Sequence, residues 1–112
     1  MAVVYVNQQE GLKRVMNNKK LYVRLLTKFR NETNLSELLG AVAAKDCDKA
    51  EETAHTLKGL CGNLSLTALY EKVTALDAQL KNKIIDTDAV DDIAACFNET
   101  QKAIDGVLAA NG

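Results

Sequence analysis

Apolar residues recur at three- and four-residue intervals along most of the chain, which is the period of a helix with one buried face. Polar residues divide the pattern into six segments. The pattern predicts six helices, the first of them short, with the following buried positions in chain order: Leu12, Val15 and Met16; Leu21, Tyr22, Leu25, Leu26 and Phe29; Leu35, Leu38, Leu39 and Val42; Ala50, Ala54, Leu57, Cys61 and Leu64; Leu69, Tyr70, Val73, Leu76 and Leu80; Val90, Ile93, Phe97, Ile104, Val107 and Leu108.

Capping residues indicate where these helices begin. Asn7 with Glu10, and Asn34 with Glu37, match N-terminal capping boxes, and Asn18 can cap the second helix. We expect the third helix to end near Lys45 and the fourth to begin at Asp46 or Asp48. The fifth should run from near Ser65 or Thr67 to about Asn82, and the sixth should begin near Asp86 or Thr87. The gaps are short, which favours antiparallel neighbours in an up-down bundle.

The composition agrees with an all-α fold. The chain has 112 residues with no proline and only 6 glycines, whereas the many turns of a β-sandwich or barrel use both residue types. This length suits one hydrophobic core, and no linker or internal repeat interrupts the chain. A single domain over residues 1–112 is therefore expected.

Charge and hydropathy argue against two classes of partner. The 14 Lys and Arg nearly balance the 15 Asp and Glu, so the basic surface that binds nucleic acid is missing. No apolar run approaches the ~20 residues of a membrane span. The apolar segment 1–6 has neither a basic leader nor a cleavage pattern, so it is not expected to be a signal peptide. These features predict a cytoplasmic protein.

The sequence carries no motif of a catalytic site. It contains no nucleotide-binding glycine loop, no zinc-protease motif and no serine-nucleophile motif. Cys47, Cys61 and Cys96 are odd in number and lack the paired spacing of a structural zinc site, so reduced, buried thiols are expected. A metal site built from His55 and these cysteines is a minor alternative.

His55, the sole histidine, stands out because it lies one position beyond the apolar stripe of the fourth helix. A neutral imidazole is a nucleophile near pH 7, and two interior glycines each cost a helix ~1 kcal/mol relative to alanine. Bare backbone beside the ring would let another protein's active site approach it. Against this, an exposed histidine is inert in most proteins, and two glycines can also serve helix packing. The residues on the same side of the helix are Glu51, Glu52, Lys58, Gly59 and Gly62.

A family resemblance lies in this segment, which is similar to the signature A-H-x-L-K-G-x-x-G-N-L/I of histidine-containing phosphotransfer (HPt) domains. It reads Ala54-His55-Thr56-Leu57-Lys58-Gly59-Leu60-Cys61-Gly62-Asn63-Leu64. Residues 11–14 and 21–29 resemble the first two helices of the family, and residues 68–80 resemble the helix after the histidine. One departure is Ser65, where many members have glycine; we expect Ser65 to cap the following helix.

The resemblance implies an antiparallel up-down four-helix bundle with additional short N-terminal helical segments. It further implies a phosphocarrier with no kinase activity, in which His55 accepts a phosphoryl group from a receiver-domain aspartate and passes it to another receiver. Lys58 would balance the phosphoryl charge, and Gly59 and Gly62 would keep the surface clear for docking. The expected partners are response-regulator receiver domains or a hybrid sensor kinase. No cofactor is expected on this chain, a monomer is expected, and Mg²⁺ would belong to the receiver.

Three alternatives stay open at this point. The domain could be an inert helical adaptor that retains the fold and uses another surface. It could be free-standing or part of a larger hybrid kinase. Glu51 and Glu52 each lie one helical turn before His55, and their spacing does not decide whether either hydrogen-bonds the ring.

Overall fold

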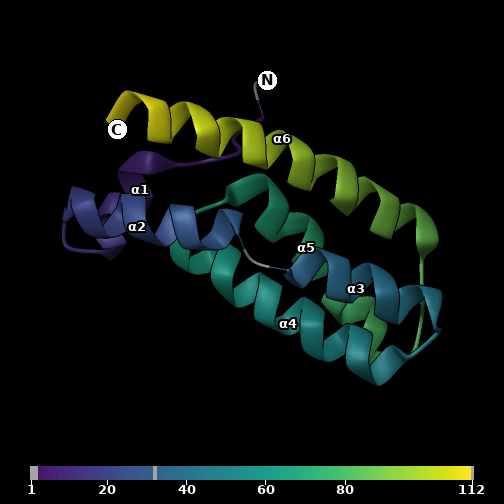
Figure 1. The fold of residues 1–112 in the computed structure, drawn as a ribbon. Coiled ribbons are helices and arrows are strands. Elements are labelled where there is room, and N and C mark those ends of the chain that lie inside the picture. The colour runs from purple at the N-terminus through teal and green to yellow at the C-terminus, as the bar shows by residue number, and fades with distance from the viewer. Residues whose placement is uncertain (1–2, 32, 112) are drawn as a thin grey trace.

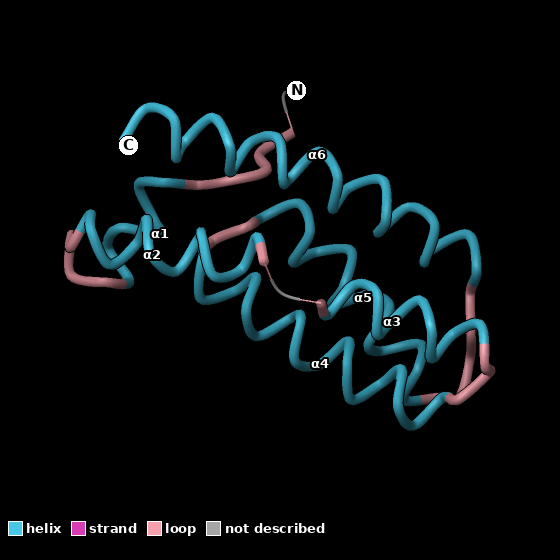
Figure 2. Tube along the Cα trace, in the orientation of Figure 1, coloured by secondary structure: helices cyan, strands magenta, loops and turns pink. Residues whose placement is uncertain are grey.

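The computed structural model describes residues 3–31 and 33–111, with only the backbone described at Asn111. The remaining residues of the expected domain, Met1, Ala2, Glu32 and Gly112, lie outside the described part. Within the described residues the chain forms helices and no strand, which confirms the all-α prediction (Figure 2). The helices are α1 (Gln8–Arg14), α2 (Lys19–Arg30), α3 (Asn34–Ala43), α4 (Cys47–Leu64), α5 (Thr67–Lys81) and α6 (Thr87–Asn111).

The last four helices form an antiparallel bundle (Figure 1). Short connections join α3 to α4, α4 to α5 and α5 to α6, so each helix packs against the one before it. The helices α2 and α3 follow each other along the same side, and both contact α4 and α6. The short α1 packs against α2 and α4. The predicted four-helix bundle with additional N-terminal helical segments is therefore confirmed.

Most of the apolar positions predicted from the periodicity are buried in one core. Three predicted positions are wrong. Met16 is 91% exposed because it follows the end of α1, where its backbone has left the helix with a φ of 56°. Leu39 and Tyr70 are exposed, whereas their neighbours Leu38 and Leu69 are buried, so these two residues lie at the edges of their apolar stripes.

Side-chain caps begin four of the helices as predicted. Each cap oxygen accepts a backbone N–H three residues later at 3.1 Å; the residues are Asn7 for α1, Asn18 for α2, Asp46 for α4 and Asp86 for α6. The capping box predicted at Asn34 is wrong by one residue. Asn34 is already helical, Thr33 holds the N-cap position, and its side chain makes no capping hydrogen bond.

Ser65 does not cap α5 as predicted; it ends α4 instead. Its φ of 57° and ψ of 44° are left-handed, a conformation that glycine adopts without a steric penalty and that costs other residues roughly 1–2 kcal/mol. Leu66 holds the N-cap position of α5, without a side-chain cap. The Ser65 hydroxyl donates instead to Glu10 Oε1 at 3.0 Å, and the Asn7 N–H donates to the Ser65 carbonyl at 2.9 Å. The turn thus forms with serine and binds the start of α1.

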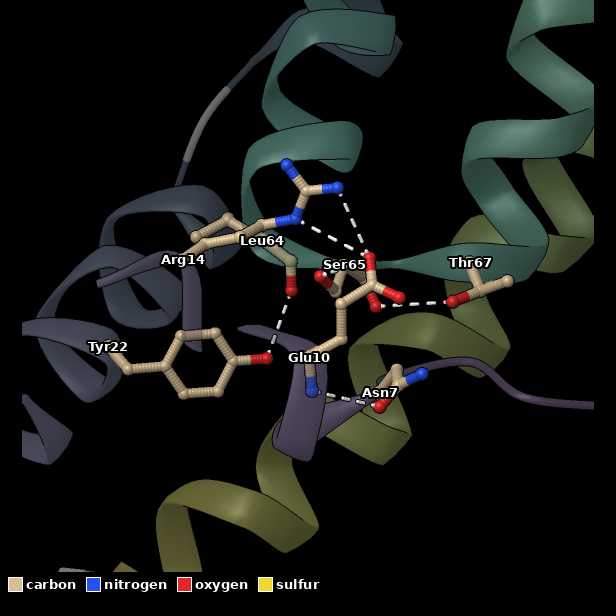
Figure 3. A network of polar contacts seen from close by, with 7 residues as sticks. All are labelled: Asn7, Glu10, Arg14, Tyr22, Leu64, Ser65 and Thr67. Atoms are coloured by element: carbon tan, nitrogen blue, oxygen red, sulfur yellow. Dashed lines mark hydrogen bonds and ion pairs between the residues drawn. The ribbon is translucent and has the colours of Figure 1, made fainter. Parts of the chain in front are cut away.

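A polar network joins α1 and α2 to the end of α4 (Figure 3). The Tyr22 hydroxyl donates to the carbonyl of Leu64 at 2.9 Å, and Arg14 pairs with Glu10 at 3.2 Å. Burial, together with the nearby Glu10 carboxylate, raises the pKa of Tyr22 to about 12. The last carbonyls of a helix have no partner within that helix. The Tyr22 hydroxyl supplies one to the carbonyl of Leu64 at the end of α4.

Residues 4–6 of the N-terminal apolar segment pack on the bundle. The Val4 carbonyl accepts the Ala68 N–H at 3.0 Å, and Tyr5 and Val6 pack against the core. Together with the Ser65 contacts, these interactions hold the segment beside the α4–α5 turn.

Gly11 tests how tightly α1 packs on α2. A Cβ at this position would lie 2.5 Å from Tyr22 Cε1 and 2.5 Å from Tyr22 Oη. Because the Tyr22 ring is buried and its hydroxyl bonded, we expect Gly11→Ala to lower the free energy of unfolding by about 1–3 kcal/mol. Urea unfolding followed by circular dichroism measures this change.

The matched control is Gly40→Ala, because a Cβ at Gly40 would have nothing within 4 Å. This change should raise the free energy of unfolding by about 0.5–1 kcal/mol through helix propensity alone. Equal effects of the two substitutions would contradict the packing argument.

Candidate functional site

The rotation of α4 decides which of its side chains reach solvent. Its apolar stripe is buried, and its members are Ala50, Ala54, Leu57, Cys61 and Leu64, as the periodicity predicts. His55 follows Ala54 and so points about 100° away from this stripe. The side chain of His55 is exposed.

The imidazole of His55 has no intramolecular partner. Among the described residues, none forms a hydrogen bond or an ion pair with it. Their spacing left open whether Glu51 or Glu52, one turn earlier, hydrogen-bonds the imidazole. In this structure neither carboxylate forms a hydrogen bond or an ion pair with the ring. Both ring nitrogens are therefore available to a molecule from solution.

His55 lies at the edge of an open hollow of about 460 Å³ on the surface. The hollow is bounded by residues of α4 and by Lys81 from α5; the α4 residues are Asp48, Glu51, Glu52, His55 and Thr56. Asp48 forms an ion pair with Lys83, which lowers the pKa of the Asp48 carboxyl. The two glutamates leave this side of the ring acidic.

The two glycines after His55 differ in their surroundings. A Cβ at Gly59 would have nothing within 4 Å, so the surface one turn beyond His55 is open. A Cβ at Gly62 would lie 3.2 Å from Cε2 of Tyr70, on α5. The space over Gly62 is therefore occupied by the chain's own tyrosine. This contact gives the missing side chain of Gly62 a role in the packing of α4 on α5.

Lys58 does not extend freely into solvent. Its Nζ lies 3.7 Å from Oδ2 of Asp77 on α5, and its side chain is only 28% exposed. Lys81 approaches the same Oδ2 at 3.2 Å. The structure thus adds Asp77 as a partner of Lys58, and it adds Lys81, which also borders the hollow at His55.

The burial of Asp77 has a signal in the sequence. Asp77 follows Val73 by four residues and precedes Leu80 by three, so it lies on the apolar stripe of α5. A charged residue on such a stripe is rarely buried without a partner. Its partner on α4 could not be predicted, because it depends on how the two helices pack.

The three cysteines are free thiols. Cys61 and Cys96 are buried, as predicted, while Cys47 is only half-buried at the start of α4. Burial raises the pKa of the Cys61 thiol to about 12, which keeps it protonated and unreactive. The described part of the chain holds no group of three or more His, Cys, Asp or Glu that could bind a metal ion.

Comparison with protein families identifies this arrangement of helices and residues. The family model of the Hpt domain matches residues 24–110, which include all of α3, α4 and α5. The chain belongs to the Hpt-domain family. Comparisons with curated proteins and with solved structures find no match. Hpt domains carry phosphoryl groups on histidine in phosphorelays; they interact with receiver domains and kinases and are phosphocarriers rather than enzymes.

The family match leaves out the N-terminal segment of the chain. The match begins at Arg24, so α1 and the first turn of α2 precede it. In this Hpt domain the preceding segment contributes Glu10 and Arg14 to a second hollow of about 390 Å³, which Lys58 and Gly59 also line. None of the described helices is both long and apolar enough to cross a membrane.

The contrast between the two glycines leads to a stability prediction. Gly59→Ala should raise the free energy of unfolding of the Hpt domain by about 0.5–1 kcal/mol, because the new methyl group meets no atom. Gly62→Ala should give a smaller gain or a loss, because Tyr70 must move aside. Chemical denaturation of both variants measures the difference, and a larger gain at Gly62 would contradict the assigned contact.

Proposed function

We propose that His55 is the phosphoryl acceptor of this Hpt domain, that it receives the group from a receiver-domain aspartate and that it passes the group to a second receiver. One observation carries this proposal: the ring is exposed on α4, without a partner among the described residues, one turn from the open backbone at Gly59. The family match covers this segment.

The chemistry needs little from this chain beyond the ring. The lone pair of an unprotonated imidazole nitrogen forms a P–N bond as the P–O bond of the aspartyl phosphate breaks, and the bonding electrons return to the receiver's carboxylate. The proton on the other ring nitrogen then passes to solvent. The return step reverses these bonds on a second receiver. Because the reaction is dominated by positioning, an exposed and unobstructed ring is sufficient on this side.

The cations that assist the transfer would come from both partners. Lys58 lies one helical turn from His55 and carries an ammonium group on a flexible stem, so it is the proposed charge partner of the phosphoryl group. We assign Mg²⁺ and the acidic pocket to the receiver, and we propose no cofactor on this chain. Gly59 is the proposed clearance residue, because any side chain there would project into the approach of the receiver.

If His55 is the acceptor, replacing it should abolish phosphoryl transfer without changing the stability of the fold. His55→Gln should change the free energy of unfolding by no more than about 0.5 kcal/mol, because the side chain is exposed. The same change should abolish the transfer of ³²P from a panel of phosphorylated receiver domains. The wild-type label should be labile in acid and stable in base, as a phosphorus–nitrogen bond requires.

Three results would contradict the acceptor role. Equal labelling of the wild type and His55→Gln would place the phosphoryl group elsewhere. The absence of label on the wild type across the panel would favour an inert adaptor with an Hpt fold. A large loss of stability in His55→Gln would show that the ring supports the structure.

The clearance role predicts a defect that depends on the size of the donor. Gly59→Phe should slow transfer from a receiver domain by about tenfold or more, since a clash that costs ~1.4 kcal/mol has this effect. Labelling by phosphoramidate, a small donor that needs no docking surface, should stay at the wild-type rate. The rates of both reactions are measured side by side.

The matched control is Gly106→Phe. A Cβ at Gly106 also meets no atom within 4 Å, and in the described structure α6 does not pack against α4. This variant should transfer like the wild type with both donors. Normal transfer from receivers to Gly59→Phe would show that docking does not need the open backbone.

A further inference from the structure

Asp77 is a buried charge that pairs with Lys58, the proposed charge partner of the phosphoryl group. Its side chain is 2% exposed, and it lies on α5 among the buried residues Val73, Leu76 and Leu80. Oδ2 faces the ammonium groups of Lys58 and Lys81, while Oδ1 is buried with no hydrogen-bond partner in the described structure. The two lysines are therefore the counter-charges of this carboxylate.

A buried carboxylate needs at least one cation. Removing the partner of a buried ion leaves an uncompensated charge at a cost of several kcal/mol. Here one carboxylate has two ammonium partners, so one of them can leave while the other keeps the charge compensated. With a single lysine, the same departure would be strongly opposed.

The distances indicate which lysine is free to leave. Lys81 lies 3.2 Å from Oδ2 and four residues from Asp77 on the same helix, which is the spacing of a stable helical ion pair. Lys58 lies farther away, at 3.7 Å, and reaches across from α4. Lys58 is also three residues after His55, so a phosphoryl group on the ring would lie within reach of its four-carbon stem.

A phosphoryl group on His55 would lie in acidic surroundings, so the movement of Lys58 toward it would balance negative charge. A phosphoryl group adds nearly two negative charges, and Glu51 and Glu52 border the same hollow. Lys81 also borders the hollow, because α5 runs antiparallel to α4 and brings Lys81 back toward the level of His55. The phosphoryl group would therefore compete with Asp77 for the nearby ammonium groups.

We propose that Asp77 is a positioning residue that holds the Lys58 ammonium group in an ion pair while His55 is unphosphorylated. When His55 carries a phosphoryl group, Lys58 pairs with that group, and Lys81 alone compensates the charge of Asp77. This inference rests on the acceptor role of His55 proposed above. In this exchange Lys81 acts through Asp77 and Lys58, although it also borders the hollow beside His55. The exchange of partners costs little because no charge is left alone in the interior.

The pKa of the phosphoryl group reports whether Lys58 has moved, because a neighbouring cation favours the dianion and lowers this pKa. The protein is phosphorylated with phosphoramidate: the donor's P–N bond breaks, ammonia leaves, and a P–N bond to His55 forms. A ³¹P NMR titration above pH 5.5 then gives the pKa. Lys58→Gln should raise it by about 0.5–1 unit relative to the wild type.

A double-mutant cycle separates the proposed exchange from direct contact by Lys81. Lys81→Gln alone should raise the phosphoryl pKa about as much as Lys58→Gln does, because Asp77 then retains Lys58. In an Asp77→Asn background, which has no buried charge to retain Lys58, Lys81→Gln should leave the phosphoryl pKa unchanged. The asparagine preserves the size of the side chain, and all variants are checked for folding by circular dichroism.

The control is Lys72→Gln, which removes a lysine from the same helix. Lys72 pairs with Asp92 and not with Asp77, so its loss should not move the phosphoryl pKa. Equal shifts from Lys81→Gln with and without Asp77 would show direct contact by Lys81 and overturn the exchange, as would no shift in either background. These results differ from a failure of the acceptor role, in which the wild type itself takes no phosphoryl group on His55.

Discussion

The burial of one apolar stripe on α4 is the constraint on which the site depends. The stripe from Ala50 to Leu64 packs between α3 and α5 and thereby fixes the rotation of the helix about its axis. His55 lies about 100° from this stripe, on the side away from the core, and its side chain is exposed. The exposure of the imidazole is thus a consequence of core packing, and the core and the site cannot vary independently along this helix.

The C-terminal end of α4 is held by residues far away in sequence. Tyr22 satisfies the carbonyl of Leu64, and Glu10 accepts the hydroxyl of Ser65. These contacts stabilise a left-handed turn at a residue other than glycine. The N-terminal segment therefore supports the helix that carries His55, although most of that segment precedes the part matched by the family model.

The polar residues around His55 divide into two groups with opposite charge. Carboxylates from the first half of α4 border the hollow at His55 together with Lys81, and Lys81 and Lys58 both pair with the buried Asp77. A buried acid between two lysines lowers their net charge while the site is empty, and it keeps both ammonium groups near the ring. The arrangement suits a carrier that must accept an anionic group and later release it, because strong retention would oppose the second transfer.

The sequence by itself determined the features that depend on residues within a few positions of each other. Helical periodicity predicted the buried stripe of α4, because that signal arises within one or two turns. Side-chain caps, which are equally local, predicted the starts at Asn7, at Asn18 and at Asp46 or Asp48, and Asp46 is the residue that caps α4. The outward position of His55 followed from the same local geometry.

The tertiary structure decided what depends on the packing of distant segments. The contact of Gly62 with Tyr70, the bond of Ser65 with Glu10 and the pairing of Lys58 with Asp77 each join different helices. No local pattern specifies such contacts, because they depend on the separation, rotation and direction of two helices at once. The role of Ser65 was therefore mispredicted and the packing contact of Gly62 was not predicted, whereas the outward position of His55 was predicted correctly.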